Sequence, residues 1–200
     1  MKIPVLLLLA LVFSAFAEKP NIILVYVDDM GYGDASCLNP KSKFKTPHLD
    51  RLAREGITFT DGHSSDTVCT PSRYGLITGR YAWRTTLKRG VMGAEGECLI
   101  ADGRVTLASF LRGQGYATAM VGKWHLGMDF PGTWENRDWT QPVKDMPLDK
   151  GFDYFWGIPA SMNYGVLAWF EGRFAKVPPT QFTAKKSNTI AISDYRIKPP

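Results

Sequence analysis

The sequence predicts an α/β fold, in which helices flank a mostly parallel sheet. Two observations point to this class. Apolar runs rich in branched side chains occupy residues 22–27 and 117–121, and such runs are typical of strands buried on both faces. Segments with helix-capping residues separate these runs, so strands and helices alternate along the chain. In open sheets of this class, ligands bind beyond the carboxyl ends of the strands.

The expected elements of the first half follow this alternation. The strand at residues 22–27 leads to a helix over residues 46–56, which begins with Thr-Pro and ends with Gly. Residues 57–60 form the next expected strand. A polar loop then leads to a helix within residues 69–79, whose final glycine is a common helix terminator.

The second half repeats the pattern. Residues 106–113 predict a helix that begins at a capping threonine, and residues 117–121 predict the buried strand that follows it. A Glu-Gly pair separates residues 166–170 from residues 173–177, which predicts a hairpin. Residues 178–200 are weakly patterned, and no regular element is expected there.

The N-terminus has the composition of a secretory signal. Lys2 supplies a positive charge, residues 5–16 are almost entirely apolar, and Ala15-Phe16-Ala17 matches a small-x-small cleavage site. The apolar run is too short for an ordinary membrane span. Residues 1–17 are therefore expected to be a signal peptide, against the alternatives of an uncleaved anchor or a buried helix, and the mature chain is expected to begin at Glu18.

Charge and cysteine content limit the range of functions. The formal net charge is +5, but the basic residues are scattered and form no patterned patch. This composition gives no support for nucleic-acid binding, and its basic tilt suits an anionic substrate. The chain contains three cysteines, which leaves one without a partner in an exported protein. If Cys69 is modified, Cys37 and Cys98 remain as candidates for a disulfide, and their spacing does not decide whether they pair.

The segment Cys69-Thr70-Pro71-Ser72-Arg73 carries the strongest functional signal. Pro71 fits the first turn of a helix. The helix dipole disfavours a cation such as Arg73 there, and a residue placed against its local preference is a candidate for function. Cys69 lies just before the helix, where backbone N–H groups favour an anion. Half of a disulfide is the ordinary role of such a cysteine, and it stays open at this stage.

Charged residues also follow the predicted strands. Asp28 and Asp29 come after the first apolar run, and Lys123 and His125 come after a later one. Adjacent carboxylates repel each other unless a cation pairs with them, and hard cations such as Ca²⁺ take oxygen ligands. Histidine suits general base catalysis because its pKa is near neutrality. Each residue alone is more often a turn, cap or surface group, but their combination with Cys69 favours a metal-dependent catalytic site.

Together these segments resemble the signatures of the type I sulfatases, the arylsulfatase-like enzymes that depend on formylglycine. The resemblance covers residues 20–165 and depends mainly on Cys69 to Tyr81 and on Gly122-Lys123-Trp124-His125-Leu126-Gly127. Further matching segments are Pro20-Asn21, Thr46 to Ala53, Gly151-Phe152-Asp153 and Gly157-Ile158-Pro159. The resemblance implies an alkaline-phosphatase-like fold and the hydrolysis of aryl or glycan sulfate monoesters.

The resemblance also implies a role for each residue of the site. A maturation enzyme would oxidise Cys69 to formylglycine before folding. One hydroxyl of the hydrated aldehyde would attack sulfur and release the alcohol, and the other would expel sulfate by re-forming the aldehyde. Arg73 would hold the formylglycine and neutralise charge, Lys123 would bind the sulfate oxygens, and His125 would assist aldehyde regeneration.

The implied metal is Ca²⁺, with Asp28, Asp29 and the modified Cys69 among its ligands. Sulfatases are longer than this chain, and their later part supplies an Asp-Asn pair, a second histidine and a lysine. Residues 18–200 are therefore expected to be the N-terminal part of a catalytic domain, with an incomplete sheet and an incomplete site that is inactive alone. A secreted or periplasmic location is expected, or a lysosomal one in a eukaryote, with no stable membrane anchor.

Other functions stay open beside this one. A phosphatase or phosphodiesterase of the same superfold typically uses two zinc ions and a Ser or Thr nucleophile, which Cys69 argues against. A truncated binding protein without catalysis is the alternative if Cys69 stays unmodified. The sequence does not specify the sulfate ester.

Overall fold

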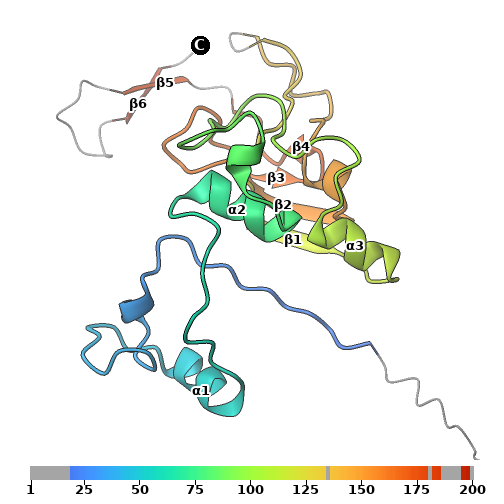
Figure 1. The fold of residues 1–200 in the computed structure, drawn as a ribbon. Coiled ribbons are helices and arrows are strands. Elements are labelled where there is room, and N and C mark those ends of the chain that lie inside the picture. Colours follow the sequence, from blue (N-terminus) through green and yellow to red (C-terminus); the bar gives the residue numbers. More distant parts are fainter. Residues whose placement is uncertain (1–18, 134–135, 180–181, 186–194, 199–200) are drawn as a thin grey trace, which may run out of the picture. The chain divides into compact units, whose positions relative to one another are not determined.

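The computed structural model describes residues 19–133, 136–179, 182–185 and 195–198. The expected signal peptide at residues 1–17 lies outside these ranges. The chain divides into two compact units, Met1–Thr58 and Phe59–Pro200, each with its own internal contacts (Figure 1).

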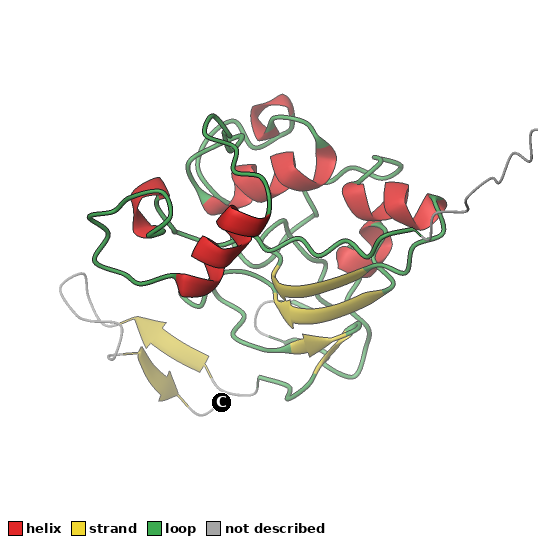
Figure 2. Cartoon of the chain, turned by 90° about the horizontal axis from the view of Figure 1, so that it is seen from below, coloured by secondary structure: helices red, strands yellow, loops and turns green. Residues whose placement is uncertain are grey.

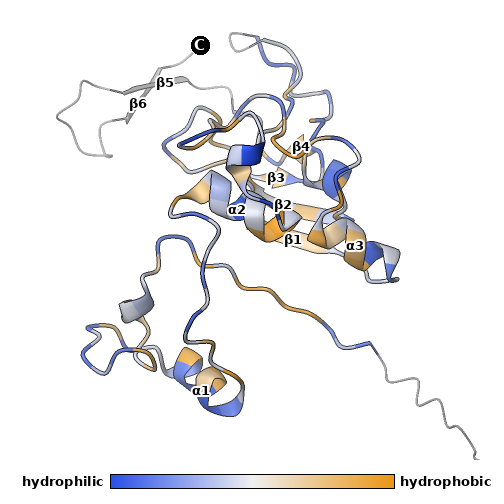
Figure 3. Cartoon of the chain, in the orientation of Figure 1, coloured by the Kyte–Doolittle hydropathy of each residue, from blue (hydrophilic) through white to orange (hydrophobic). Residues whose placement is uncertain are grey.

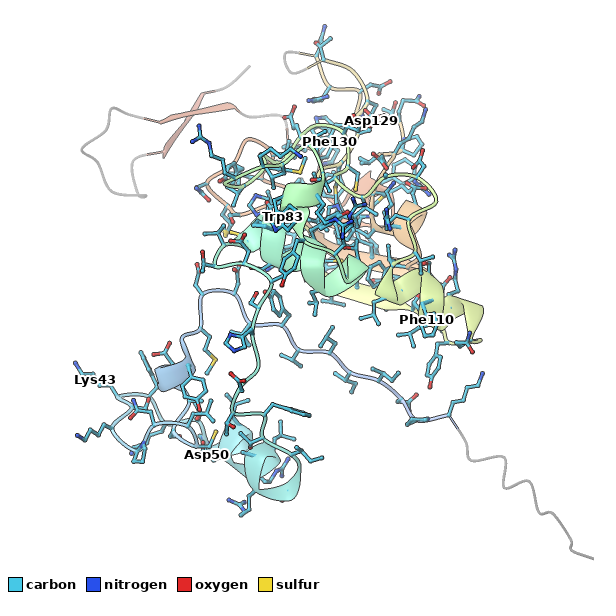
Figure 4. The ribbon with its side chains drawn as sticks, in the orientation of Figure 1. Lys43, Asp50, Trp83, Phe110, Asp129 and Phe130 are labelled. Atoms are coloured by element: carbon cyan, nitrogen blue, oxygen red, sulfur yellow. The ribbon has the colours of Figure 1, made fainter. Side chains whose placement is uncertain are left out.

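The first unit contains a 3₁₀ helix, η1 (Tyr32–Asp34), and α1 (Pro47–Glu55). The helix predicted within residues 46–56 is therefore confirmed. Asp50 lies in this helix (Figure 4). Side chains hold the start of the helix, because the Ser36 hydroxyl donates to Asp50 at 2.8 Å and the Thr46 hydroxyl donates to the same carboxylate at 3.0 Å. The hydrogen bond from Ser36 is the main reason that the pKa of Asp50 is lowered.

The strands predicted at residues 22–27 and 57–60 are wrong for this structure. Neither run forms a strand, and the described residues contain no strand paired with either of them. The first run is an apolar segment that is exposed along its length, with Ile23 87% exposed (Figure 3). The physical reason is that apolar, branched residues favour extended backbone, whereas a strand also needs a neighbour for its N–H and C=O groups.

A mixed sheet organises the second unit. Its strands are β1 (Ala119–Lys123), β2 (Tyr154–Ile158), β3 (Phe170–Glu171) and β4 (Phe174–Ala175), in the order β1-β2-β3-β4 (Figure 2). Pairing is parallel between β1 and β2, with Lys123 opposite Ile158, and antiparallel between the other neighbours. The predicted α/β class and the β3–β4 hairpin are thus confirmed. Parallel pairing is limited to β1 and β2 within the described residues.

A separate antiparallel pair consists of β5 (Phe182–Lys185) and β6 (Tyr195–Lys198). The sequence predicted no regular element in this region. Strand β1 also begins two residues later than its predicted range, and it is less buried than expected. Val121 is 73% exposed because β1 is the outermost strand of the described sheet.

Helix α3 (Leu107–Gly113) begins after the threonine that the sequence indicates, and α2 (Cys69–Thr78) ends where predicted but begins at Cys69 itself, which was expected to lie just before the helix. The Thr106 hydroxyl accepts the Ser109 N–H at 2.9 Å and caps α3. Gly79 follows α2 in the left-handed conformation. Helix α2 contacts α3 and the short η2 (Ala82–Arg84).

The loop that follows β1 forms the centre of the hydrophobic core. Trp124, Leu126 and Met128 are fully buried there, and the rings of Phe155 and Phe170 from the sheet belong to the same cluster. The Trp124 indole donates to the Gly127 carbonyl at 2.8 Å, so its polar atom is satisfied inside the core. The residues between β1 and Met128 are therefore held in place by the packing of these side chains against the sheet and by the indole hydrogen bond.

A buried lysine ties two loops together behind this core. Lys150, in η3 (Pro147–Lys150), places its ammonium 2.6 Å from Asp145 and 3.0 Å from Asp102. Burial opposes the charge, but the hydrogen bonds that the ammonium donates to Asp145 and Asp102 prevail and raise the pKa of Lys150. The other oxygen of Asp145 accepts the backbone N–H of Cys98 at 2.8 Å.

The cysteines are all free thiols in this structure, so it contains no Cys37–Cys98 disulfide. Cys37 is exposed, whereas Cys98 is 6% exposed. Burial raises the pKa of the Cys98 thiol to about 12.

We expect this difference to control thiol reactivity. At about pH 8 a thiol with a pKa of about 12 is only about one part in ten thousand thiolate, which is the reactive form. Iodoacetamide should therefore modify Cys37 in the native chain and Cys98 only after unfolding, as measured by peptide mass spectrometry over time. Equal rates at both cysteines under native conditions would contradict the burial and the pKa of Cys98.

Candidate active site

Cys69 is the first residue of α2, and the loop before it is fastened to the helix. The Ser72 hydroxyl donates to the Asp66 carbonyl at 2.7 Å, and the Ser65 hydroxyl donates to the Pro71 carbonyl at 3.2 Å. A Cβ on Gly75 would lie only 2.0 Å from the Ser65 hydroxyl, so this close approach requires glycine. Cys69 thereby has a defined place at a helix start, where N–H groups and the helix dipole favour an anion.

Arg73 joins this helix to the end of β1. Its side chain is buried, and its Nη1 donates to the Lys123 carbonyl at 2.5 Å. Since α2 begins at Cys69, Arg73 falls just beyond the first turn rather than inside it as predicted. The guanidinium thus lies between two segments that are far apart in sequence, and it brings them together.

Lys123 is the last residue of β1, and His125 lies two residues after it. The parallel ladder continues past the strand, since the Trp124 N–H donates to the Ile158 carbonyl at 3.0 Å and the His125 N–H donates to the Pro159 carbonyl at 2.8 Å. The Lys123 ammonium donates to the Ser161 hydroxyl at 3.0 Å. The structure thus places Lys123 and His125 at the end of β1, with Arg73 bonded to the Lys123 carbonyl, and their roles as site residues stay a prediction.

His125 is fully buried and has an unusual backbone conformation. Its Nε2 lies 2.9 Å from the Met92 carbonyl oxygen, and its ring lies 5.0 Å from the ring of Tyr164. Its φ angle is +59°, in the left-handed region that non-glycine residues seldom adopt. Such strain persists only where the surrounding structure imposes it, and it concentrates at functional sites.

Asp28 and Asp29 belong to the first unit. They line a hollow of about 420 Å³, together with Met30, Asp34, Phe44, Lys45 and Thr46. Asp29 shares the strained conformation of His125, with a φ angle of +60°. The Asp34 carboxylate accepts the Gly31 N–H at 2.8 Å, so it is engaged in a local turn.

The predicted calcium ligands come from both units, since Cys69 belongs to the second. Within the described ranges, the structure contains no group of three or more His, Cys, Asp or Glu side chains arranged to hold a metal. The set of Asp28, Asp29 and Cys69 therefore stays a prediction, whereas the Arg73, Lys123 and His125 group is present in one unit.

Sequence reasoning missed Ser161 and Met92. Ser161 follows β2 closely, so the rule that drew attention to Lys123 at a strand end could also have identified it. Met92 contacts His125 through its backbone carbonyl, and no side-chain pattern could have indicated this.

The family model described as Sulfatase matches residues 20–189 of this chain. The chain belongs to the sulfatase family. The family that the motifs predicted is thus confirmed, and the sulfatase alkaline-phosphatase-like fold with it.

Two curated sulfatases show the extent of the similarity. The N-acetylgalactosamine-6-O-sulfatase of Bacteroides thetaiotaomicron is 42% identical over 147 residues, which is 74% of this chain and 28% of that protein. Arylsulfatase A of Homo sapiens is 41% identical over 160 residues, which is 80% of this chain and 29% of that protein. The chain therefore spans less than a third of the length of these relatives.

A solved structure shows the same partial overlap in three dimensions. It comes from work on the metabolism of multiple glycosaminoglycans by Bacteroides thetaiotaomicron, and it matches with a TM-score of 0.72 and 38% identity. The match covers 84% of this chain and 34% of that one.

Among the described residues, no helix of this sulfatase chain is long and apolar enough to cross a membrane.

Proposed function

We propose that the protein carrying this chain hydrolyses sulfate monoesters with a formylglycine nucleophile made from Cys69. The observation that carries this proposal is the docking of the Cys69 helix, through Arg73, onto the strand end that presents Lys123 and His125. Family membership supports the reaction class. The names of the relatives favour a sulfated glycan or an aryl sulfate as the substrate.

The reaction needs two hydroxyls on one carbon. Oxidation of Cys69 by a maturation enzyme supplies an aldehyde, and its hydrate has both. One hydroxyl oxygen loses its proton and bonds to sulfur, while the bond from sulfur to the alcohol oxygen breaks and that oxygen takes up a proton and leaves as the alcohol. The second hydroxyl then loses its proton, the aldehyde re-forms, and sulfate leaves with the electron pair of the broken bond between carbon and the sulfated oxygen. Covalent catalysis of this kind divides one difficult step into two easier ones.

The residues around Cys69 have distinct roles in this scheme. Arg73 neutralises charge beside the nucleophile from a fixed position, because its Nη1 is held by the Lys123 carbonyl. Lys123 offers its ammonium to the sulfate oxygens, and Ser161 orients that ammonium through a 3.0 Å hydrogen bond. His125 takes the proton from the second hydroxyl, as a positioned general base.

The donor chemistry of the first unit fits a hard cation. Asp28 and Asp29 supply carboxylate oxygens, and the backbone of Asp29 has the positive φ angle that is typical of functional sites. We infer that both would hold Ca²⁺ together with the formylglycine oxygen. Ca²⁺ takes six to eight oxygens, so further ligands or water would complete the shell. When bound, the ion would lower the electrostatic cost of gathering anionic groups at the site.

A phosphatase or phosphodiesterase function is less well supported, because Cys69 stands where those enzymes typically use Ser or Thr. Export from the cytoplasm, through a signal peptide at residues 1–17, is also part of the proposal.

Replacing Cys69 should abolish sulfate ester hydrolysis in the full-length protein. The Cys69→Ala variant removes the nucleophile, so its rate should fall by several powers of ten in an aryl sulfate assay. Cys37→Ala is the matched control, because it removes an exposed free thiol and should leave the rate unchanged. Retention of more than about a hundredth of the activity by Cys69→Ala would rule out the covalent role.

Replacing either aspartate should weaken metal binding. Asp28→Asn and Asp29→Asn each remove one negative charge from the inferred shell, so both should raise the Kd for Ca²⁺ in calorimetry of the full-length protein. Asp34→Asn is the control, since Asp34 lines the same hollow but is engaged in a turn. If Asp28→Asn and Asp29→Asn both bind Ca²⁺ with the Kd of the unsubstituted protein and of the Asp34→Asn control, the assignment is refuted.

A further inference from the structure

We propose that Thr70 and the Met92 peptide fix His125 in the tautomer that carries its proton on Nε2, which makes Nδ1 the basic nitrogen. Thr70 is then a positioning residue, which acts on His125 through the backbone. The tautomer does not depend on the function proposed above. Only the role of Nδ1 as the catalytic base rests on that proposed function.

A continuous path of contacts links the residue next to Cys69 with His125. Thr70 is fully buried, and its hydroxyl oxygen accepts the Met92 N–H at 3.2 Å. The carbonyl of the same residue, Met92, lies 2.9 Å from His125 Nε2. One residue thus connects the start of α2 to the imidazole, and both of its backbone polar groups are used.

The chemistry of the carbonyl assigns the proton. A carbonyl oxygen has lone pairs and no hydrogen, so it can only accept. The group facing it must therefore be an N–H, which places the proton of the neutral ring on Nε2 and the lone pair on Nδ1. A ring flip would put the carbon Cε1 in the place of Nε2, so it would break this bond inside a fully buried site packed against Tyr164.

These contacts require a hydrogen-bond acceptor in the side chain at position 70, directly after Cys69. The Met92 N–H is half-buried and needs an acceptor, because a donor that is withdrawn from water without one is costly. A serine at position 70 meets this need, whereas a valine of similar shape to threonine does not. Thr70→Val should therefore release the Met92 peptide and with it the control of the His125 tautomer.

Nitrogen NMR of the histidine rings tests this directly. The chain has three histidines, and His48 and His63 are exposed, so His48→Gln and His63→Gln assign the spectrum. Long-range ¹H–¹⁵N correlation of the ¹⁵N-histidine-labelled 200-residue chain distinguishes a ring nitrogen that carries a proton from one that has a lone pair. The variants are Thr70→Val, Thr70→Ser and, as control, Thr78→Val, which loses a hydroxyl bonded only to the Tyr74 carbonyl of the same helix.

The expected spectrum has an N–H type resonance at Nε2 of His125 and a lone-pair type resonance at Nδ1. This pattern should persist in Thr70→Ser and Thr78→Val, and it should change to averaged shifts in Thr70→Val. A proton on Nδ1 in the unsubstituted chain would overturn the assignment, even if no variant folds. An unchanged spectrum in Thr70→Val would overturn the role of Thr70. Since no substrate is involved, loss of the proposed sulfatase function would not alter either result.

Discussion

The hydrogen bond from the Arg73 guanidinium to the Lys123 carbonyl is the contact on which the candidate site depends. It joins α2, which begins at Cys69, to the end of β1, which presents Lys123 and His125. A buried guanidinium is costly to place unless its donors are used. The backbone carbonyl supplies a partner of fixed position, so the cation can act on a developing charge without having to reorganise.

The second constraint is the rigid loop after β1. Backbone hydrogen bonds from Trp124 and His125 to the segment after β2 extend the parallel pairing beyond the strands themselves. His125 is fully buried in the surrounding core, and its φ angle is positive. Asp29 has a positive φ angle as well, although it lies in the other unit. Strain at both residues agrees with their prediction as site residues from sequence motifs alone.

The elements that the sequence predicts correctly are those determined by neighbouring residues. Thr106 caps α3 through a bond to Ser109, and Gly79 ends α2 through its own backbone conformation. Strand formation depends on a distant partner instead, which explains why the apolar run at residues 22–27 is not a strand here. The same distinction applies to the candidate site: motif spacing predicted Cys69, Arg73, Lys123 and His125, but a backbone contact such as that of Met92 has no sequence signature.

The central claim is that the fixed helix start at Cys69 holds a formylglycine. Mass spectrometry of the tryptic peptide ending at Arg73, taken from the full-length protein made in its native host, tests this most directly. The account predicts a peptide whose mass is lower by the difference between H₂S and an oxygen atom, since the thiol has become an aldehyde. A peptide with an intact Cys69 thiol throughout the sample would contradict the claim and favour a binding protein without catalysis.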